Sequence, residues 1–249
     1  MTVPISRKGS GSARPKIVQM AVWRANSYPF SALAQAPQLV DRHGRSATEQ
    51  AAKVANIMVL VELITPEQAP LLAKAYFADG DPGPITAALA QVPELLEVAL
   101  PFIGAVLSPS SIDWRTKEMV ILRTSAILAC RYCVDSHTPV ALDSGLTHEE
   151  VRALREIPAH DERAVSAFAD GRERALMSWI DAVALGPGPV APSAAIAIKK
   201  HYANHEIVEL TLLIATTLLL NRFATALQLP VHPSTIERLV VEGFADETP

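Results

Sequence analysis

Cysteine is scarce in this sequence, whose 249 residues contain only Cys130 and Cys133. Two cysteines this close in sequence cannot link distant parts of a chain, as the disulfides of small secreted domains do. We therefore expect the two thiols to work together chemically rather than to staple the fold. This use of cysteine favours a protein of the reducing cytoplasm.

The sequence also lacks an excess of charge of one sign. Its 22 Lys and Arg residues against 26 Asp and Glu residues give a formal charge of -4. Binding to a phosphate backbone needs a basic excess, so nucleic acid is not an expected partner. A Gly/Ser stretch follows the basic N-terminus where an export signal has its apolar region, so no export signal is expected.

Long apolar runs are missing as well. The two most apolar stretches are Val54–Ile64 and Ile207–Leu220, and each contains a glutamate, Glu62 and Glu209 respectively. Both fall short of the roughly 20 residues that cross a bilayer. They predict buried helices, with no membrane-spanning segment.

Apolar residues as a whole are abundant, at 49% of the chain with a mean hydropathy of +0.21, which supports a large core. Alternating runs bounded by Asn-Gly or Asp-Gly hairpin turns are absent from the core region, whereas helical spacing recurs. We predict an all-α bundle of roughly ten helices. Residues 1–45 read as an N-terminal arm and residues 46–249 as one helical domain, with a motif core at about 91–160.

Capping signals give the expected starts of the helices, namely Ser46, Thr65 with Pro66 behind it, Pro93, Asp113, Thr147, Pro192, Asn204 and Pro233. Turn residues mark expected breaks at 79–84, 108–111 and 186–189. The two cysteines lie between the signals at Asp113 and Thr147. They therefore belong to the central part of the predicted bundle.

The cysteines form a C-x-x-C-x-x-x-H motif with His137. Such a pair can close to a disulfide and reopen by thiol exchange. The attacking species is a thiolate, so one thiol needs a pKa lowered from about 8.5, which a helix N-terminus or an imidazolium can do. On a helix Cys133 and His137 share one face, which makes His137 a candidate proton carrier for the Cys133 thiol.

Glu118 joins this motif only if the chain bends. Twelve residues of straight helix would put Glu118 about 18 Å from Cys130. A reversal near Ile127 and Leu128 would instead bring Glu118 opposite His137 on antiparallel helices, with Cys130 at the start of the second helix. No Gly or Pro marks this bend, so a Glu118 supplied by a neighbouring subunit is the alternative.

Glu118, Cys130, Cys133 and His137 together fit the pattern E-x(11)-C-x-x-C-x-x-x-H. In this the chain resembles the redox branch of the alkylhydroperoxidase D and carboxymuconolactone decarboxylase superfamily. The flanking stretches 91–95 and 143–147 are similar too, as are 174–176, 206–210 and 221–222, so the resemblance covers about 91–230.

The resemblance implies an all-helical, homo-oligomeric thiol-dependent peroxidase or disulfide oxidoreductase without metal or organic cofactor. In it Cys133 attacks the peroxide, Cys130 resolves the sulfenate to a disulfide, and Glu118 and His137 relay protons. Its partners would be a small peroxide or disulfide substrate and a thiol electron donor. The best-known member has a second histidine just before the second cysteine. Tyr132 stands there in this chain, so the relay is shorter or includes the Tyr132 hydroxyl.

Other interpretations of these residues stay open. A decarboxylase or other acid-base lyase of the same superfamily would use His137 and Glu118 with idle thiols. A non-catalytic helical protein could bind zinc through the motif, with His201-x-x-x-His205 as further ligands, although these two histidines are more typical of helix-end surface residues. The polar pair 221–222 interrupts an apolar helix, which indicates a buried polar contact or an interface salt bridge.

Overall fold

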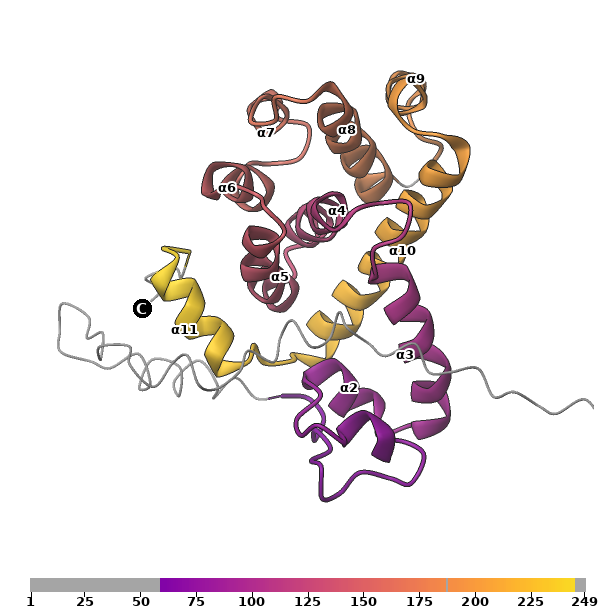
Figure 1. Cartoon of the computed structure of the whole chain (residues 1–249), viewed down its shortest axis with the longest axis vertical. Helices are drawn as coiled ribbons and strands as arrows, with labels where there is room; N and C mark the ends of the chain where they lie inside the picture. The colour runs from indigo at the N-terminus through magenta and orange to yellow at the C-terminus, as the bar shows by residue number, and fades with distance from the viewer. Residues whose placement is uncertain (1–58, 187, 245–249) are drawn as a thin grey trace, which may run out of the picture.

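The computed structural model describes residues 59–186 and 188–244 (Figure 1). Within these ranges the chain forms ten α-helices and one short 3-10 helix, without strands, which confirms the all-α prediction. In chain order the elements are η2 (Lys74–Phe77), α2 (Pro84–Leu89), α3 (Pro93–Leu107), α4 (Trp114–Ile127), α5 (Arg131–Asp143), α6 (His148–Glu156), α7 (Glu162–Ser166), α8 (Gly171–Leu185), α9 (Pro192–His201), α10 (Asn204–Leu227) and α11 (Pro233–Val241). The predicted arm at 1–45 and the helix expected from Ser46 lie outside the described residues.

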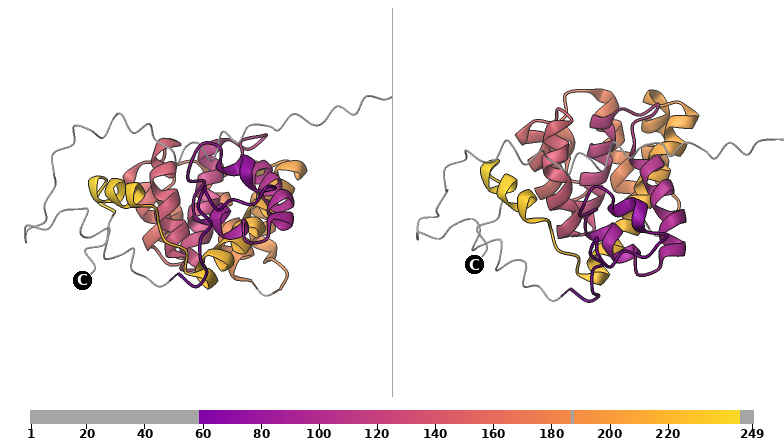
Figure 2. Two further views of the ribbon diagram at one scale, coloured as in Figure 1. Left: turned by 90° about the horizontal axis from the view of Figure 1, so that it is seen from below. Right: turned by 60° about the horizontal axis from the view of Figure 1, so that its bottom comes forward.

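Helix α4 is the centre of the bundle. Ten of its 14 residues are buried, and it packs against α5, α6, α8 and α10 (Figure 1). Helix α3 lies on α10 and on α2, while α11 lies along α5 at the outside of the bundle (Figure 2). The α4–α5 pair that carries the motif is therefore enclosed by most of the other elements.

The capping signals explain why these helices begin where they do. The Asp113 carboxylate accepts the N–H of Thr116 at 2.8 Å, and Thr147 and Glu150 form the predicted capping box at the start of α6. Proline at the first helical position opens α2, α3, α9 and α11, where its fixed φ suits the helix and its missing N–H costs nothing. The predicted starts from Pro93 onward are confirmed.

The prediction of a helix that begins at Thr65 is wrong. Residues 59–73 contain bends and turns and no helix. Pro70 gives the reason, since it would stand in the second turn of a helix begun at Pro66. There its ring clashes with the carbonyl four residues earlier, and it has no N–H to donate to that carbonyl.

The buried helix predicted over Val54–Ile64 is also wrong in its described part, 59–64. The backbone there bonds to other elements instead. The N–H of Leu60 donates to the Leu227 carbonyl at 3.1 Å, and the N–H of Ile64 donates to the Ala87 carbonyl at 3.3 Å. Tertiary hydrogen bonds thus replace the helical ones.

The second apolar run, Ile207–Leu220, lies inside α10. This helix has 24 residues and is longer than the run suggests. By length and composition alone it is the one helix in the described part of the chain that could cross a membrane. It buries eight of its residues and packs against α3, α4, α5 and α8, as a core helix does.

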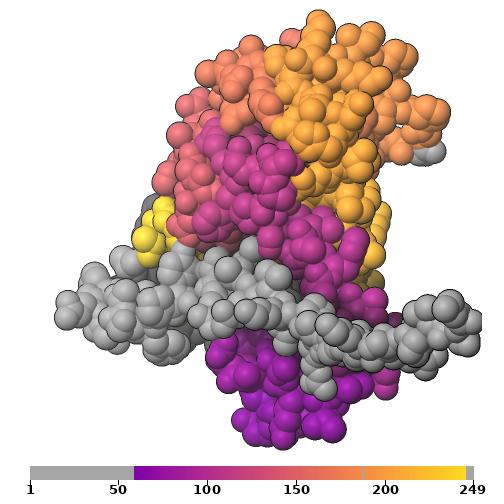
Figure 3. Space-filling view, turned by 45° about the vertical axis from the view of Figure 1, so that its right-hand side comes forward, coloured from indigo at the N-terminus to yellow at the C-terminus, as the bar shows by residue number. Residues whose placement is uncertain are grey.

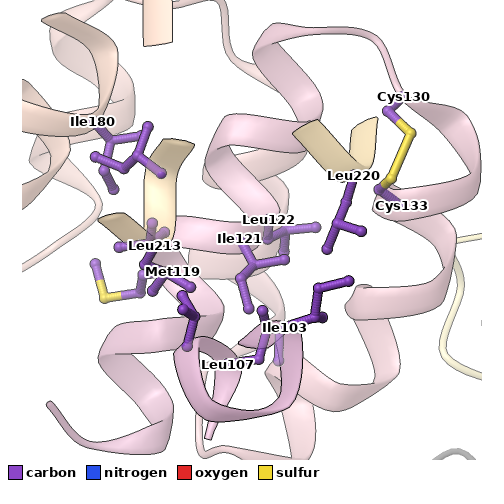
Figure 4. Packing of buried hydrophobic residues seen from close by; sticks show 14 of the residues in the cluster. Ile103, Leu107, Met119, Ile121, Leu122, Cys130, Cys133, Ile180, Leu213 and Leu220 are labelled. Carbon is purple, nitrogen blue, oxygen red and sulfur yellow. A yellow bond between two sulfur atoms is a disulfide. The ribbon is translucent and has the colours of Figure 1, made fainter. Parts of the chain in front are cut away.

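The hydrophobic core is one cluster built from nearly all the elements. Figure 4 shows part of it, with residues from α3, α4, α8 and α10 meeting around Ile121 and Leu122. Both cysteines belong to this cluster, and the disulfide lies at its edge beside Leu220 of α10. The cysteine motif is therefore built into the core and not onto a surface loop.

Candidate active site

A tight turn reverses the chain between α4 and α5. The N–H of Cys130 donates to the Ser125 carbonyl and the N–H of Ala129 to the Ala126 carbonyl, both at 3.0 Å. Ala129 has φ 51, so the turn is a Schellman motif with alanine at the position that glycine usually takes. The predicted bend is confirmed, and because alanine takes the glycine position, no Gly marks the bend in the sequence.

The turn delivers Cys130 to the N-terminus of α5, where it is the N-cap residue. Its carbonyl accepts the N–H of Val134 at 2.9 Å. One turn along, Cys133 is bonded to it in a disulfide with a Cα–Cα distance of 5.4 Å. When the pair is reduced, the unsatisfied N–H groups and positive dipole end of α5 favour a thiolate here.

Both cysteines are shielded from water. The exposed fraction is 1% for Cys130 and 5% for Cys133, whereas the His137 side chain is 26% exposed. Of the motif residues, His137 is thus the one with a substantial surface.

Glu118 and His137 face each other across the α4–α5 pair. The Glu118 carboxylate Oε2 lies 3.0 Å from His137 Nδ1, and the Glu118 side chain is only 3% exposed. This confirms the apposition predicted from their equal distances to the bend. Glu118 comes from the same chain, so the geometry does not need a neighbouring subunit to supply it.

The contact assigns the protonation pattern of the ring. An ionised carboxylate only accepts hydrogen bonds, so Nδ1 carries the proton that bonds to Glu118. Nε2 is then the ring nitrogen left to take or give a proton, which is how a carboxylate–histidine pair acts as a base. Cys133 precedes His137 by one helical turn on the same face of α5.

A buried charged side chain that the motif did not indicate ties α4 to α8. Arg123 is 1% exposed and forms a two-pronged ion pair with Asp181 of α8, with distances of 2.8 and 3.0 Å. It also donates to the Ile157 carbonyl at 2.6 Å. A charged residue in an apolar stretch of helix was the available signal, because a buried charge demands a partner.

Asn221 of α10 makes the buried polar contact that its sequence environment indicates. It is 1% exposed, and its Oδ1 accepts the Ser125 hydroxyl at 3.0 Å. Ser125 is also the residue whose carbonyl closes the turn before Cys130. Asn221 therefore ties α10 to the reversal that positions the thiols.

Residues 93–182 match the model of the Carboxymuconolactone decarboxylase family. The stretch runs from the first residue of α3 into α8 and contains all four motif residues. Over this stretch the chain is similar to the Carboxymuconolactone decarboxylase family, in agreement with the resemblance that the motif indicates.

Two bacterial proteins are similar to this chain in sequence. The protein YdfG of Bacillus subtilis (strain 168) is 27% identical over 119 residues, which cover 47% of this chain and 77% of that protein. An uncharacterized protein of Mycobacterium tuberculosis (strain H37Rv) is 31% identical over 110 residues, 44% of this chain. The match spans 37% of the length of the mycobacterial protein.

Solved structures share the fold of this chain. A peroxidase-related protein with an alkylhydroperoxidase AhpD core, from Ralstonia eutropha JMP134, aligns with TM-score 0.58 and 16% identity over 71% of this chain and 96% of that one. The debrominase Bmp8 aligns with TM-score 0.55 and 18% identity over 76% of this chain and 98% of that one. At these identities the likeness extends to the fold alone.

Tyr132 stands where the best-known superfamily member has a histidine. Its phenol lies near the Ser136 side chain, one turn along α5. Burial raises the pKa of Tyr132 well above its ordinary value, and the negative charge of Asp81 raises it further. The phenol therefore stays protonated and is suited to donate a hydrogen bond rather than to act as a base. Its contact with Ser136 does not link it to the Glu118–His137 pair, and its part in a relay remains a prediction.

A pocket of about 380 Å³ opens beside the α4–α5 turn, lined by Ala129, Arg131 and Arg155 among others. Among the described residues, no group of three or more His, Cys, Asp or Glu side chains is placed to hold a metal ion. His201 and His205, the additional zinc ligands considered, are both exposed at helix ends.

Proposed function

We propose that this chain is a thiol-dependent peroxidase and disulfide oxidoreductase whose Cys130–Cys133 pair cycles between dithiol and disulfide. The observation that carries the proposal is that one helix pair, α4 and α5, holds both a cysteine pair and a carboxylate–histidine pair. A cysteine pair that can close to a disulfide stands at a helix N-terminus, and a carboxylate–histidine pair at 3.0 Å stands one turn away.

In the first step the Cys133 thiolate attacks one oxygen of a hydroperoxide. A sulfur–oxygen bond forms and the oxygen–oxygen bond breaks, which leaves a sulfenic acid on Cys133. The departing alkoxide takes a proton from His137, which earlier accepted the thiol proton on Nε2. Glu118 holds the ring in place and stabilises the imidazolium form.

In the second step the Cys130 thiol attacks the sulfenic sulfur. The disulfide forms, the sulfur–oxygen bond breaks, and water leaves. The sum is one hydroperoxide and two thiols converted to one alcohol, one water and one disulfide. An external thiol electron donor then reduces the disulfide by exchange, so the cycle needs no metal or organic cofactor. A reducing compartment such as the cytoplasm would supply that donor.

Thiol mass spectrometry tests the proposal. The reduced protein treated with one equivalent of peroxide should lose about two daltons, localised to the peptide that carries Cys130 and Cys133, because two hydrogens leave when the disulfide forms. Cys133→Ser should abolish peroxide turnover, while Cys130→Ser should leave a sulfenate that a dimedone probe traps. Retained turnover in Cys133→Ser would refute the assignment.

A second candidate function rests on the unequal exposure of the site. His137 reaches solvent while both cysteines are buried, which suits an acid-base lyase of carboxymuconolactone decarboxylase type that leaves the thiols idle. Full turnover of carboxymuconolactone by a variant lacking both cysteines, lost on His137→Asn, would favour this candidate over the first.

A further inference from the structure

Asn221 of α10 is buried with half of its amide group unused. It is 1% exposed, and its Oδ1 accepts the Ser125 hydroxyl at 3.0 Å. Its Nδ2 has no hydrogen-bond partner among the residues that the structure describes. A buried amide nitrogen without an acceptor costs free energy, so native structures rarely keep one without a reason. The unused donor indicates an acceptor that another state of the protein supplies.

Two contacts place this amide at the turn that carries the sulfur atoms. Ser125, which holds Oδ1, is also the residue whose carbonyl accepts the N–H of Cys130 at 3.0 Å. Leu220, the neighbour of Asn221 on α10, lies beside the disulfide (Figure 4). Asn221 is therefore held between α10 and the α4–α5 turn, on the side of the core that the disulfide borders.

The bond to Ser125 also fixes the direction in which the amide faces. Because an amide group is planar, holding Oδ1 against Ser125 sets the position of Nδ2 as well. Helix α4 packs on α10, and in the space-filling view the orange atoms of α10 adjoin the magenta atoms of the α3–α4 region (Figure 3). The Nδ2 donor is thus oriented in advance toward an acceptor inside the core.

The sulfur atoms are acceptors whose strength depends on their redox state. Sulfur in a disulfide is a weak acceptor, whereas a thiolate is charged and accepts strong hydrogen bonds. When an external dithiol reduces the pair, the sulfur–sulfur bond breaks and two electrons and two protons pass to the cysteines, while the dithiol closes to its own disulfide. The two cysteine sulfurs then separate, so one of them is free to approach a neighbouring donor.

We infer that Asn221 Nδ2 donates a hydrogen bond to the Cys130 sulfur in the reduced protein and thereby favours the dithiol over the disulfide. The inference rests on the redox cycle of the proposed function. Cys130 is the assigned sulfur because its own N–H bonds to Ser125, the anchor of the amide, while Cys133 shares its face of α5 with His137. In that cycle the bond activates Cys130 for its attack on the sulfenic sulfur of Cys133.

A buried water is the competing acceptor. The hydroxyl of Thr124, the residue before Ser125, is also buried without a partner in the described part of the chain, so one water could bridge it to Nδ2. Such a water would satisfy Nδ2 equally in both redox states. The disulfide equilibrium would then be independent of Asn221, which distinguishes the two acceptors.

Equilibration of the full chain with dithiothreitol buffers tests the inference without any peroxide. Asn221→Leu has nearly the same shape but no donor, and Ser125 can turn its hydroxyl to a carbonyl of its own helix. The disulfide of this variant should be harder to reduce, with an equilibrium constant about tenfold smaller, which corresponds to a potential about 30 mV more negative. Mass spectrometry of alkylated thiols after an acid quench measures the reduced fraction.

Two further variants separate a donor from a merely structural contact. Ser125→Ala removes the same Ser125–Asn221 bond but keeps Nδ2, so it should shift the equilibrium less than Asn221→Leu does. Thr217→Val, one turn earlier on α10 and 3% exposed, removes a hydroxyl that bonds to its own helix at 2.8 Å. It should leave the equilibrium unchanged. Circular dichroism checks that all three variants are folded.

Ultraviolet absorbance of the thiolate in a Cys133→Ser background tests the assignment to Cys130. Adding Asn221→Leu should move ionisation of the Cys130 thiol to higher pH, with about tenfold less thiolate at a pH below its titration. An unchanged titration, or equal redox shifts in Asn221→Leu and Ser125→Ala, would overturn the inference and leave the proposed function standing. A wild-type pair that dithiothreitol cannot reduce would overturn both.

Discussion

Ala129 lies in the turn that positions the two thiols. Its φ of 51 is a left-handed conformation, which costs an L-residue other than glycine roughly 1–2 kcal/mol. We expect Ala129→Gly to raise the free energy of unfolding by up to about 1 kcal/mol, since the greater freedom of glycine in the unfolded chain offsets part of the relief. Urea denaturation measures the difference.

Ala182→Gly is the control for Ala129→Gly, because Ala182 lies within α8 and away from the turn. Glycine in a helix interior lowers stability by about 0.5–1 kcal/mol. Opposite signs for the two Ala→Gly changes would support a strained turn at Ala129. If both variants lose stability equally, the turn carries no strain.

Glu118→Gln separates the charge of Glu118 from its shape. Glutamine can still accept the His137 Nδ1–H bond, but it stabilises the imidazolium less, so peroxide turnover should fall by about 10- to 100-fold, as when a carboxylate partner of a histidine is lost. Stopped-flow peroxide consumption measures the rate. Glu149→Gln, exposed in the first turn of α6, should leave the rate unchanged, and an equal loss in both variants would contradict the role given to Glu118.

The sequence predicts some of these contacts and not others for a simple reason. Glu118 and His137 lie at similar distances from one bend, so helix geometry alone brings them together. The partner of Arg123 is 58 residues away on α8, and no local pattern pairs the two. Tertiary packing decides such contacts, and the sequence shows only that a buried charge needs a partner.

At the scale of elements, Lys117 joins three parts of the bundle. Its ammonium group is fully buried, donates to the Val106 carbonyl of α3 at 2.8 Å, and pairs with Glu209 of α10 at 2.8 Å. Glu209 also accepts bonds from Ser110 and Ser111 in the α3–α4 connection. The start of α4 is thereby fixed to α3 and α10 at once.

Glu209→Gln should lower the free energy of unfolding by about 2–4 kcal/mol, because it leaves a buried ammonium without its counter-ion. Denaturant titration measures this. Lys117→Met combined with Glu209→Gln should lie closer to the wild type than Glu209→Gln alone, since no buried charge then remains. A double variant that is less stable than Glu209→Gln would show that the pair does not act as a unit.

The Lys117–Glu209 ion pair also predicts that the stability of the fold depends on pH. Burial opposes ionisation of Glu209, but the bonds from Lys117, Ser110 and Ser111 prevail and lower its pKa. A carboxyl whose folded pKa is lowered stabilises the fold above its unfolded pKa, near 4.3, and this stabilisation is lost as the pH falls through the folded value. Between about pH 5 and pH 3 the wild type should therefore lose more stability than Glu209→Gln in parallel urea titrations. Equal slopes would contradict the prediction.

Helix starts were predictable where a capping residue or a leading proline acts locally, as at Asp113, Thr147 and Pro192. The conformation of residues 59–73 was not predictable, because their backbone forms hydrogen bonds to α2 and to the end of α10. Helix α7 has only five residues and a correspondingly weak periodic signal. Local chemistry thus sets the boundaries of the long elements, and long-range contacts set the remainder.

On the scale of the whole molecule, the segment after α10 encloses the motif from outside. Helix α11 lies along α5 (Figure 2), and Arg238 bonds to the Asp143 carboxylate at 2.6 and 2.9 Å. Phe244 follows α11 and is 5% exposed. The helix that carries Cys133 and His137 is therefore covered by residues about a hundred positions later in the chain.

Phe244→Ala tests whether this cover stabilises the motif helix. The ring stacks on His148 at 5.5 Å and lies under the guanidinium groups of Arg152 and Arg155 at 5.2 and 5.0 Å, so the variant should lose about 3 kcal/mol of unfolding free energy. Because α11 holds α5, amide exchange should accelerate in α5 and α6 as well as in α11. Val241→Ala, at a site on α11 that is 69% exposed, should leave stability and exchange unchanged. Faster exchange confined to α11 in the Phe244→Ala variant would mean that the motif helix is stable without its cover.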